Sequence, residues 1–593
     1  MLLATVAAAA APGVAADAAA TSATIQLVLD KSISSSEEAL VTFSIPFAAG
    51  VLHNVDELAI RRGDAEIPAY VEPGLLWQGR RHGVRSAVVQ LQGVALQDGR
   101  ALLSFDTRRL NSSTAPVPRL KKLAITSGYT RAGPQKAGLA YPRVFALLPP
   151  AYLAASALIS PYKPGAPGDA FTRFADSHFD ASAGTPFDYS KSAVADWLFD
   201  RATADYKRYM DSGRVEHLKE AFLAFRFYIR HIKQTDTPGT NCATQGRGGW
   251  FGLGPEEKCN DTKYTYVEPI KLHYALTGDD TWFEGTDSVK AQVEAMDVQT
   301  TRSNAEWGGS DCASASNQEN YNFTERKCGL ELLNHVNACT MYGGASCARA
   351  AATIAFLQDL QQRPKPFDLA NGWVPLPGFF RHSWHKHECA ACSDWNTAVG
   401  AGNRDDRRFS PWMSENIADA LWQAYWQLDP TLVADHDQIG EILRRLAVAV
   451  DNFAFTTSPL GKRVPNNDLE HAPGGETWRI DCNTGPLPLY SASDIASPAA
   501  LVATESADGW FSDMHSPELL TILAAGWYFE RDPANRASLR KRAESIEAGF
   551  ISHCTNSNDT RLRGTPRAWN WMMRSNGQRT WDWVTSNQAA PAP

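Results

Sequence analysis

Outside its alanine-rich N-terminus, the sequence of 593 residues lacks any run approaching the roughly 18 apolar residues of a membrane span. The chain also has no excess of basic residues, since its net charge is −8. Nucleic-acid-binding proteins typically carry a basic stripe. No GxSxG, Walker, Rossmann or HExxH pattern stands in a supporting context. We therefore predict neither a membrane span nor a nucleic-acid partner, and none of the chemistry that those motifs carry.

The N-terminus and the cysteines indicate an oxidising compartment. Leu2 to Ala11 form a short apolar run followed by small-residue cleavage sites, so residues 1–20 are expected to be an export signal, although a basic n-region is missing. The ten cysteines are even in number, which favours disulfides. We expect an exported protein, periplasmic or secreted. The cysteine order suggests the pairs 242–259, 312–328, 339–347, 389–392 and 482–554.

Two kinds of hydrophobic pattern divide the chain. Residues 21–115 alternate apolar and polar positions between Gly and Asp breaks, which predicts a small β-barrel or sandwich. Residues 116–185 are rich in Pro, Gly and Ala and are expected to be a connector. Residues 186–593 are mostly helical in pattern. The predicted class is multidomain α+β.

The helical part repeats. Apolar helices carrying Tyr or Trp stop at Gly or Asp-Pro turns near residues 212, 278, 343, 429 and 532, and another helix follows each turn. Such hairpins are expected to close into an (α/α)6-type toroid, with an open solenoid as the alternative. The insertions at 235–262, 302–320, 370–410 and 455–512 would then gather at one mouth, where function is usually carried.

Two stretches resemble known families. The segment 41–92, with Ile45-Pro46-Phe47, Glu66-Ile67-Pro68-Ala69 and Trp77…Arg85, resembles the RIFT-type β-barrel of exo-rhamnogalacturonan-lyase-like proteins. The segments "DWLFDRATADYKRYMDSGRVEHLKEA" and "YALTGDDTWF" are similar to the (α/α) toroids of polysaccharide lyases and unsaturated-glycan hydrolases. The resemblance implies a carbohydrate-active enzyme, but it is architectural. The further β-sandwich domain of some of those lyases has no obvious counterpart here.

Aromatic, acidic and amide residues recur at successive predicted helix starts, as in a glycan cleft. The candidates for catalysis are Glu268, Tyr321, Glu325, Arg326, His382, His385, Asp513 and His515. The candidates for substrate binding are Tyr189, Trp250, Tyr266, Lys271, Trp307, Asn320, Trp384, Trp412, Glu415 and Trp510. Each acidic residue could instead serve as an N-cap or first-turn charge.

Two reactions compete for these residues. Elimination from a uronate needs a cation for the substrate carboxylate and a base for the C5 proton, and Arg326, Tyr321, His382 and His385 offer such a set. Hydrolysis needs two carboxyl groups, which Glu268, Glu325, Asp513 and Glu518 could supply. The β-barrel resemblance favours elimination on an acidic polysaccharide or oligosaccharide. A non-catalytic glycan-binding protein is the third hypothesis.

The segment 382–392 could also be read as a metal site. His382, His385 and His387 precede Cys389 and Cys392, but a CxxC without a second pair in an exported protein fits a disulfide better than zinc. Calcium at Asn403, Asp405 and Asp406 is the other option, against a solvated loop with balancing arginines. We therefore predict no metal and no cofactor. The sequence leaves the oligomeric state open.

Overall fold

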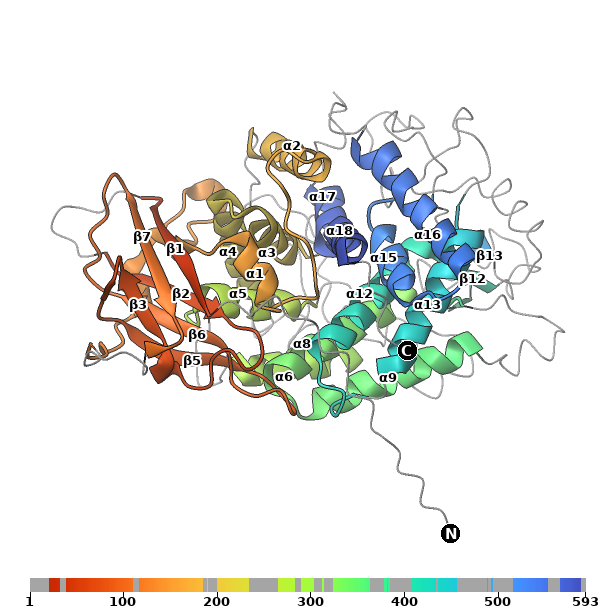
Figure 1. The fold of residues 1–593 in the computed structure, drawn as a ribbon, viewed down its shortest axis with the longest axis horizontal. Coiled ribbons are helices and arrows are strands. Elements are labelled where there is room, and N and C mark those ends of the chain that lie inside the picture. The colour runs from red at the N-terminus through yellow and green to blue at the C-terminus, as the bar shows by residue number, and fades with distance from the viewer. Residues whose placement is uncertain are drawn as a thin grey trace, which may run out of the picture.

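The computed structural model places a β part, made of strands β1 to β10, before a helical part that begins with α1 (Figure 1). This order confirms the predicted succession of strands and helices. None of the described helices is long and apolar enough to cross a membrane. The structure describes residues 21–31, 39–109, 117–184, 189, 200–233, 265–282, 289–302, 312–313, 324–362, 378–380, 382–383, 407–433, 436–455, 488, 492–493, 516–552 and 566–587.

Two antiparallel sheets form the β part, in the orders β10-β1-β7-β3-β4 and β2-β6-β5. Strand β7 pairs with both β1 and β3, and β6 pairs with both β2 and β5. Phe47, next to β2, meets Phe105 of β7 edge-on with ring centroids 5.7 Å apart, so the sheets share a core. The strands are β1 (Ser22–Leu29), β2 (Val41–Pro46), β3 (Ala59–Arg62), β4 (Ala65–Glu66), β5 (Tyr70–Leu76), β6 (Val84–Leu91) and β7 (Arg100–Asp106).

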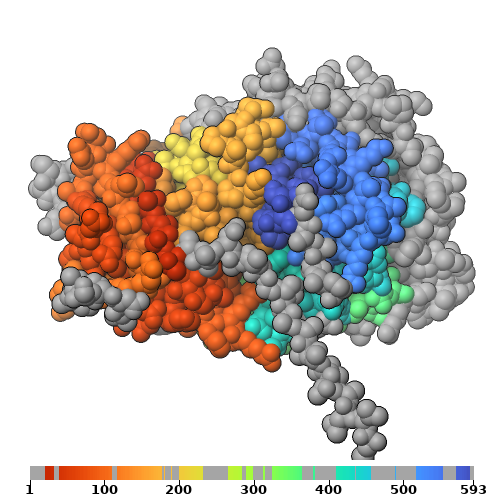
Figure 2. All heavy atoms as spheres, in the orientation of Figure 1, coloured from red at the N-terminus to blue at the C-terminus, as the bar shows by residue number. Residues whose placement is uncertain are grey.

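The segment expected to be a connector contributes to both parts. It supplies the small ladder β8 (Tyr129–Arg131) with β9 (Ala140–Pro142), and β10 (Val144–Leu147), which pairs with β1. Helices α1 (Pro150–Ala155) and α2 (Ala170–Gly184) follow. Figure 2 shows the orange atoms of this segment between the red β part and the blue C-terminal helices. Its Pro and Gly content hid these short strands, which carry too few residues for a clear alternation.

One set of helices, here called the inner helices, contacts one another in a closed circuit. Helix α3 packs on α5, α5 on α8, α8 on α12, α12 on α15 and α15 on α18. Arg579 of α18 forms an ion pair with Asp211 of α3, and α17 also packs onto α3. They are α3 (Arg201–Ser212), α5 (Glu268–Thr277), α8 (Glu325–Tyr342), α12 (Pro411–Gln427), α15 (Leu519–Phe529), α17 (Pro566–Arg574) and α18 (Gly577–Asn587).

A second helix follows each of the first five inner helices. These outer helices are α4 (Val215–Lys233), α6 (Val289–Arg302), α9 (Ala345–Gln362), α13 (His436–Phe453) and α16 (Pro533–Ile546), the last continued by a π-helical turn, Glu547–Ser552. The five predicted turns are confirmed: Gly213 and Gly278 end α3 and α5 in the left-handed conformation that glycine adopts without steric cost. Asp532 caps α16 by accepting from two backbone N–H groups.

The β part covers the C-terminal ends of inner helices. Gln78 donates to the carbonyl of Met341 on α8 (3.2 Å), and Arg81 donates to the carbonyl of Trp426 on α12 (2.8 Å). A Cβ built on Gly278, just after α5, would lie 2.8 Å from the side chain of Val88 on β6. Helix C-termini carry partial negative charge, which a cation such as Arg81 stabilises. The β part therefore covers the C-terminal ends of α5, α8 and α12.

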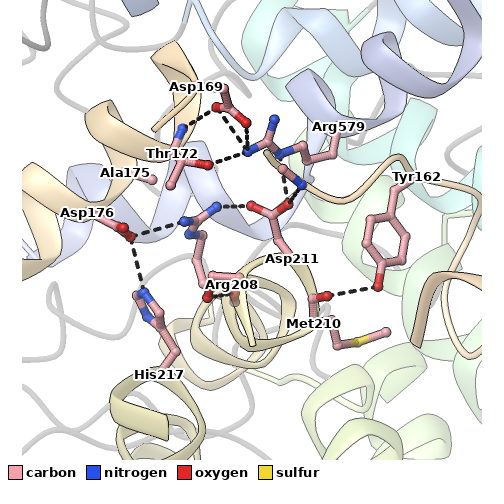
Figure 3. A network of polar contacts seen from close by, with 12 residues as sticks. Tyr162, Asp169, Thr172, Ala175, Asp176, Arg208, Met210, Asp211, His217 and Arg579 are labelled. Atoms are coloured by element: carbon pink, nitrogen blue, oxygen red, sulfur yellow. Dashed lines mark hydrogen bonds and ion pairs between the residues drawn. The ribbon is translucent and has the colours of Figure 1, made fainter. Parts of the chain in front are cut away.

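Buried ion pairs tie the beginning of the helical part to its end (Figure 3). Arg208 on α3 donates to Asp176 on α2 (3.1 Å) and pairs with Asp211. Asp211 also forms an ion pair with Arg579 on α18 (2.8 Å between Nε and a carboxylate oxygen), and Arg579 donates to Thr172 on α2 (2.7 Å). Three helices far apart in sequence are thereby held together by charge-assisted bonds.

Two disulfides and a buried histidine fix α8 against its neighbours. The predicted pairs Cys312–Cys328 and Cys339–Cys347 are confirmed, and the other three predicted pairs lie outside the described residues. His335 on α8 lies 2.5 Å from a carboxylate oxygen of Asp297 on α6, and Ser346 on α9 donates to the other oxygen (2.6 Å). Although burial opposes the charged form, Asp297 and Glu331 raise the pKa of His335 to about 9.

This raised pKa predicts a pH-dependent contribution to stability. A group whose pKa is higher in the folded state stabilises fully below its unfolded value, near 6.5, and the stabilisation is lost as pH rises through about 9. The free energy of unfolding of the native chain should therefore exceed that of His335→Gln by a margin that shrinks between pH 6 and pH 10. Urea titrations of both proteins across this range measure it, and a constant margin contradicts the assignment.

Candidate functional site

Buried charged side chains gather where the inner helices face one another. Each is at most 3% exposed, and they come from α3, α5, α12 and α17 and from the residues that precede α3 and α15. We call this set the charged cluster: Asp200, Lys207, Glu268, Lys271, Glu415, Asp419, Glu518 and Arg574. Buried charges persist in proteins only when they are paired, so the pairing decides what the cluster can do.

The cluster has two cation–carboxylate centres. The Nζ atom of Lys207 lies 3.0 Å from Oε1 of Glu268 and donates to the carbonyl of Arg574 (2.6 Å). Arg574 in turn donates to Oε2 of Glu415 (3.0 Å) and lies 3.5 Å from Asp419. Within the described residues, Oε2 of Glu268 and Oε1 of Glu415 have no hydrogen-bond partner. Each carboxyl group thus keeps one oxygen for an external partner.

The carboxyl groups differ in protonation. Burial raises the pKa of Glu415 well above its ordinary value, with Asp419 and Glu518 adding to the effect against Arg574. Burial likewise raises the pKa of Glu518 well above the ordinary value and that of Asp200 to about 7. Burial also acts on Glu268, but Lys207, Lys271 and Arg574 outweigh it and lower the pKa of Glu268. The pKa values of Glu415 and Glu268 are thus shifted in opposite directions, as is typical of acid–base sites.

Two tryptophan rings lie on α12 and α17, the helices that carry Glu415 and Arg574. Trp412 lies 5.8 Å from Trp571 between ring centroids, and the guanidinium of Arg326 lies 5.6 Å from the Trp412 ring. Glu325 accepts from the backbone N–H of Ser410 (2.6 Å), which joins the starts of α8 and α12. Among the predicted residues, the structure thus brings Glu268, Lys271 and Glu415 into the cluster and places Arg326 beside Trp412.

Two predicted sugar contacts have buried protein partners instead. The hydroxyl of Tyr189 donates to Glu220 on α4 (2.7 Å), and its ring packs 4.8 Å from that of Phe227. The ring of Tyr266, directly before α5, lies 5.6 Å from Tyr228. Both tyrosines are therefore engaged in packing between α4 and the inner helices.

The backbone of His382 lies in a small sheet that links two predicted insertions. Strand β12 (Arg407–Phe409) pairs with both β11 (His382–Ser383) and β13 (Ala492–Ser493). Phe409 stacks on Phe379 with ring centroids 3.5 Å apart, which anchors this sheet. The insertions 370–410 and 455–512 therefore meet beside the start of α12.

Other predicted residues lie outside the described part of the chain. These include the histidine–cysteine segment beyond Ser383, the calcium candidates 403–406 and the predicted export signal. The remaining site candidates in this group are Trp250, Trp307, Asn320, Tyr321, Trp384, His385, Trp510, Asp513 and His515. Among the described residues, no three His, Cys, Asp or Glu side chains are grouped as metal ligands would be.

Sequence reasoning missed Asp200, Lys207, Asp419 and Arg574, whereas it had named Glu518 as a carboxyl group for hydrolysis. A signal for Asp419 was present, because Glu415, Asp419, Gln423 and Gln427 recur every four residues on an otherwise apolar helix and so share one face. Lys207 and Arg574 had no such signal, since each is one cation among several in its segment. Only the packing of α17 on α3 brings them together.

Comparisons with known proteins add little to this geometry. No protein-family model matches the chain, and no curated protein matches it. A solved structure described as a polysaccharide lyase matches with a TM-score of 0.35 and 9% identity, over 70% of this chain and 99% of that chain. A TM-score this low supports no inference about function.

The Lys207–Glu268 pair predicts a large stability effect. Lys207→Met should lower the free energy of unfolding by about 3–5 kcal/mol, because Glu268 loses its nearest cation while staying buried. The double variant Lys207→Met/Glu268→Gln should recover part of this loss. Urea titration measures both.

A matched control is Lys290→Met. Its pair with Glu294 on α6 is exposed at both ends, so its loss should cost under about 1 kcal/mol. Equal effects of Lys207→Met and Lys290→Met would contradict the pairing.

Proposed function

We propose that this chain is an exported enzyme that cleaves glycosidic linkages of an acidic polysaccharide, with the charged cluster as its catalytic centre. The observation that carries the proposal is the buried pair Glu415 and Glu268, each with an oxygen free of hydrogen bonds within the described residues and with pKa values shifted in opposite directions. Disulfides Cys312–Cys328 and Cys339–Cys347 support an oxidising compartment.

The scaffold we propose is an (α/α)6-type toroid behind a RIFT-type β-barrel. The closed circuit of inner-helix contacts supports the toroid, and the two antiparallel sheets support the barrel. We keep the boundaries 1–20 for the signal, 21–115 for the β domain, 116–185 for the connector and 186–593 for the toroid. In this division the connector lends β10 to the sheet of the β domain.

Substrate is proposed to approach the N-terminal ends of the inner helices. The β part covers the C-terminal ends of α8 and α12, which leaves the opposite ends. Helix N-termini carry partial positive charge and attract anions. An acidic glycan therefore fits this end better than a neutral one.

Elimination is the first reaction that we propose. Arg326, beside Trp412, would neutralise the substrate carboxylate and so acidify the C5 proton. Tyr321 and the histidines 382, 385 and 515 remain candidate bases, and Glu415 as an acid would protonate the leaving oxygen. The sequence resemblance to lyase toroids favours this reaction.

Hydrolysis is the second candidate, and the carboxyl pair favours it. Protonated Glu415 would be the general acid, and ionised Glu268 the base or nucleophile. Both reactions use Glu415 as an acid, but only hydrolysis needs the second carboxylate.

A substrate panel tests the proposal. The full chain should release reducing ends from a uronate-containing polysaccharide, and Glu415→Gln should lower kcat by about 10²- to 10⁴-fold as an acid is lost. Ultraviolet absorbance of an unsaturated uronate identifies elimination, whereas reducing ends without absorbance identify hydrolysis.

Glu294→Gln, on the exposed face of α6, is the control and should leave kcat unchanged. Retention on glycan affinity gels without any cleavage would contradict the enzyme proposal and leave a binding protein.

A further inference from the structure

A buried line of side chains connects the β part to the charged cluster. It begins at Arg85 on β6 and continues through Gln427 and Gln423, two turns of the polar face of α12, to Glu268. Arg85, Gln423 and Gln427 are each at most 3% exposed. We call these four side chains the relay.

Each contact in the relay is a hydrogen bond. Arg85 Nη2 donates to Gln427 Oε1 (3.0 Å), and Lys271 Nζ donates to the same oxygen (2.8 Å). Gln427 Nε2 donates to Gln423 Oε1 (3.3 Å), and Gln423 Nε2 donates to Glu268 Oε1 (3.2 Å). The relay thus spans the distance from the covered end of the inner helices to the candidate catalytic carboxylate.

The direction of the relay follows from donor and acceptor chemistry. Arg85 can only donate, so it fixes the oxygen of the Gln427 amide toward itself, and Lys271 donates to the same oxygen. The Gln427 NH₂ group must then face Gln423, which turns the Gln423 NH₂ group toward Glu268 and toward Asp419, to which it also donates (3.1 Å). Asn337 reinforces this order by donating to Gln423 Oε1 (3.3 Å).

We propose that Arg85 of the β part is a positioning residue for the charged cluster, orienting Gln427 and Gln423 so that an N–H group always points at Glu268. This inference rests on the proposed function for its catalytic meaning and on the contacts alone for its geometry. It makes the β part a component of the catalytic centre and not a separate binding module.

The charges around the relay agree with this role. Burial, followed by the charge of Arg85, lowers the pKa of Lys271 well below its ordinary value, and a neutral Lys271 still donates to Gln427. The other charged groups that influence the protonation of Glu268 or Lys271 are Lys207 on α3, Arg574 on α17, Asp419 on α12 and Asp200 before α3. These four groups belong to the charged cluster itself, whereas Arg85 lies outside it.

Arg81 provides a matched control. Arg81 lies in the β5–β6 connection, just before the strand that carries Arg85. It donates to the backbone carbonyls of Trp426 and Gln427 but makes no bond to the Gln427 side chain. Arg85 also has purely structural contacts, with the carbonyls of Thr340 and Leu158 and with the Trp77 ring. A comparison of the two arginines separates positioning from simple support.

The test measures pH profiles of kcat and KM for the full chain and for Arg85→Met, Arg85→Lys and Arg81→Met. Arg85→Met should lower kcat by about 10- to 100-fold with little change in KM, as expected for misplaced catalytic groups. The acid limb of the kcat–pH profile of Arg85→Met should move to higher pH. The reason is that a less firmly held Gln423 amide stabilises the Glu268 carboxylate less. Arg85→Lys should restore part of kcat, and Arg81→Met should lower only the melting temperature.

Identical pH profiles for Arg85→Met and Arg81→Met would overturn the proposal. If Arg85→Met does not fold, Gln427→Glu takes its place, because it keeps the shape but removes the donor to Gln423. Its acid limb should move in the same direction, whereas the buried Gln361→Glu on α9, which bonds only to backbone carbonyls, should leave the limb unchanged.

A readout without substrate keeps this proposal separate from the proposed function. In protein labelled with ¹³C at the lysine ε-carbon, the Lys271 signal, assigned by its loss in Lys271→Gln, should titrate at a higher pH in Arg85→Met than in the native chain. Equal titration would overturn the relay even if glycans are cleaved. A shifted titration with no cleavage of any glycan would support the relay and reject only the enzyme.

Discussion

The pairing of buried charge between the inner helices is the interaction on which the rest of this structure depends. Lys207, Glu268, Glu415 and Arg574 are removed from water, which is costly unless each charge meets an opposite one at hydrogen-bond distance. The packing of α3, α5, α12 and α17 brings these four side chains together. Loss of one partner would leave the other buried without an opposite charge, so the pairs help to hold the helices in this arrangement.

The contact with the β part makes the two ends of the helical part different. Its arginines meet the negative ends of α8 and α12, and the sheet residues beside Gly278 approach α5 too closely for any side chain at that position. With that end covered, we propose the first turns of the inner helices as the place for substrate. The same contact lets Arg85 reach the polar face of α12 from the opposite end.

Neighbouring carboxyl groups whose pKa values differ make the cluster suited to acid–base chemistry. Burial raises the pKa of Glu415 and of Glu518 although Arg574 opposes it, whereas Lys207 and Lys271 outweigh burial and lower the pKa of Glu268. A purely structural ion network would favour full pairing and ionisation. Carboxyl groups whose pKa values are driven apart are instead typical of acid–base sites.

Local pattern was enough to determine the elements and several of their ends. Period-two alternation predicted a β domain over residues 21–115, where β1 to β7 lie. Gly and Asp-Pro turns indicated where α3, α5, α8, α12 and α15 stop, because both signals arise from backbone conformations of a few residues. Cysteine order likewise gave the two described disulfides, which close short loops.

Only the tertiary structure decided which charges meet. Lys207 and Glu268 are 61 positions apart in the sequence (268 − 207), and Arg574 lies far beyond both. No local spacing therefore relates the three residues. The sequence placed Glu268, Lys271 and Glu415 at a site because they stand near helix starts, yet it could not assign their protonation. That depends on burial and on partners from other helices, which exist only once the circuit of inner helices has closed.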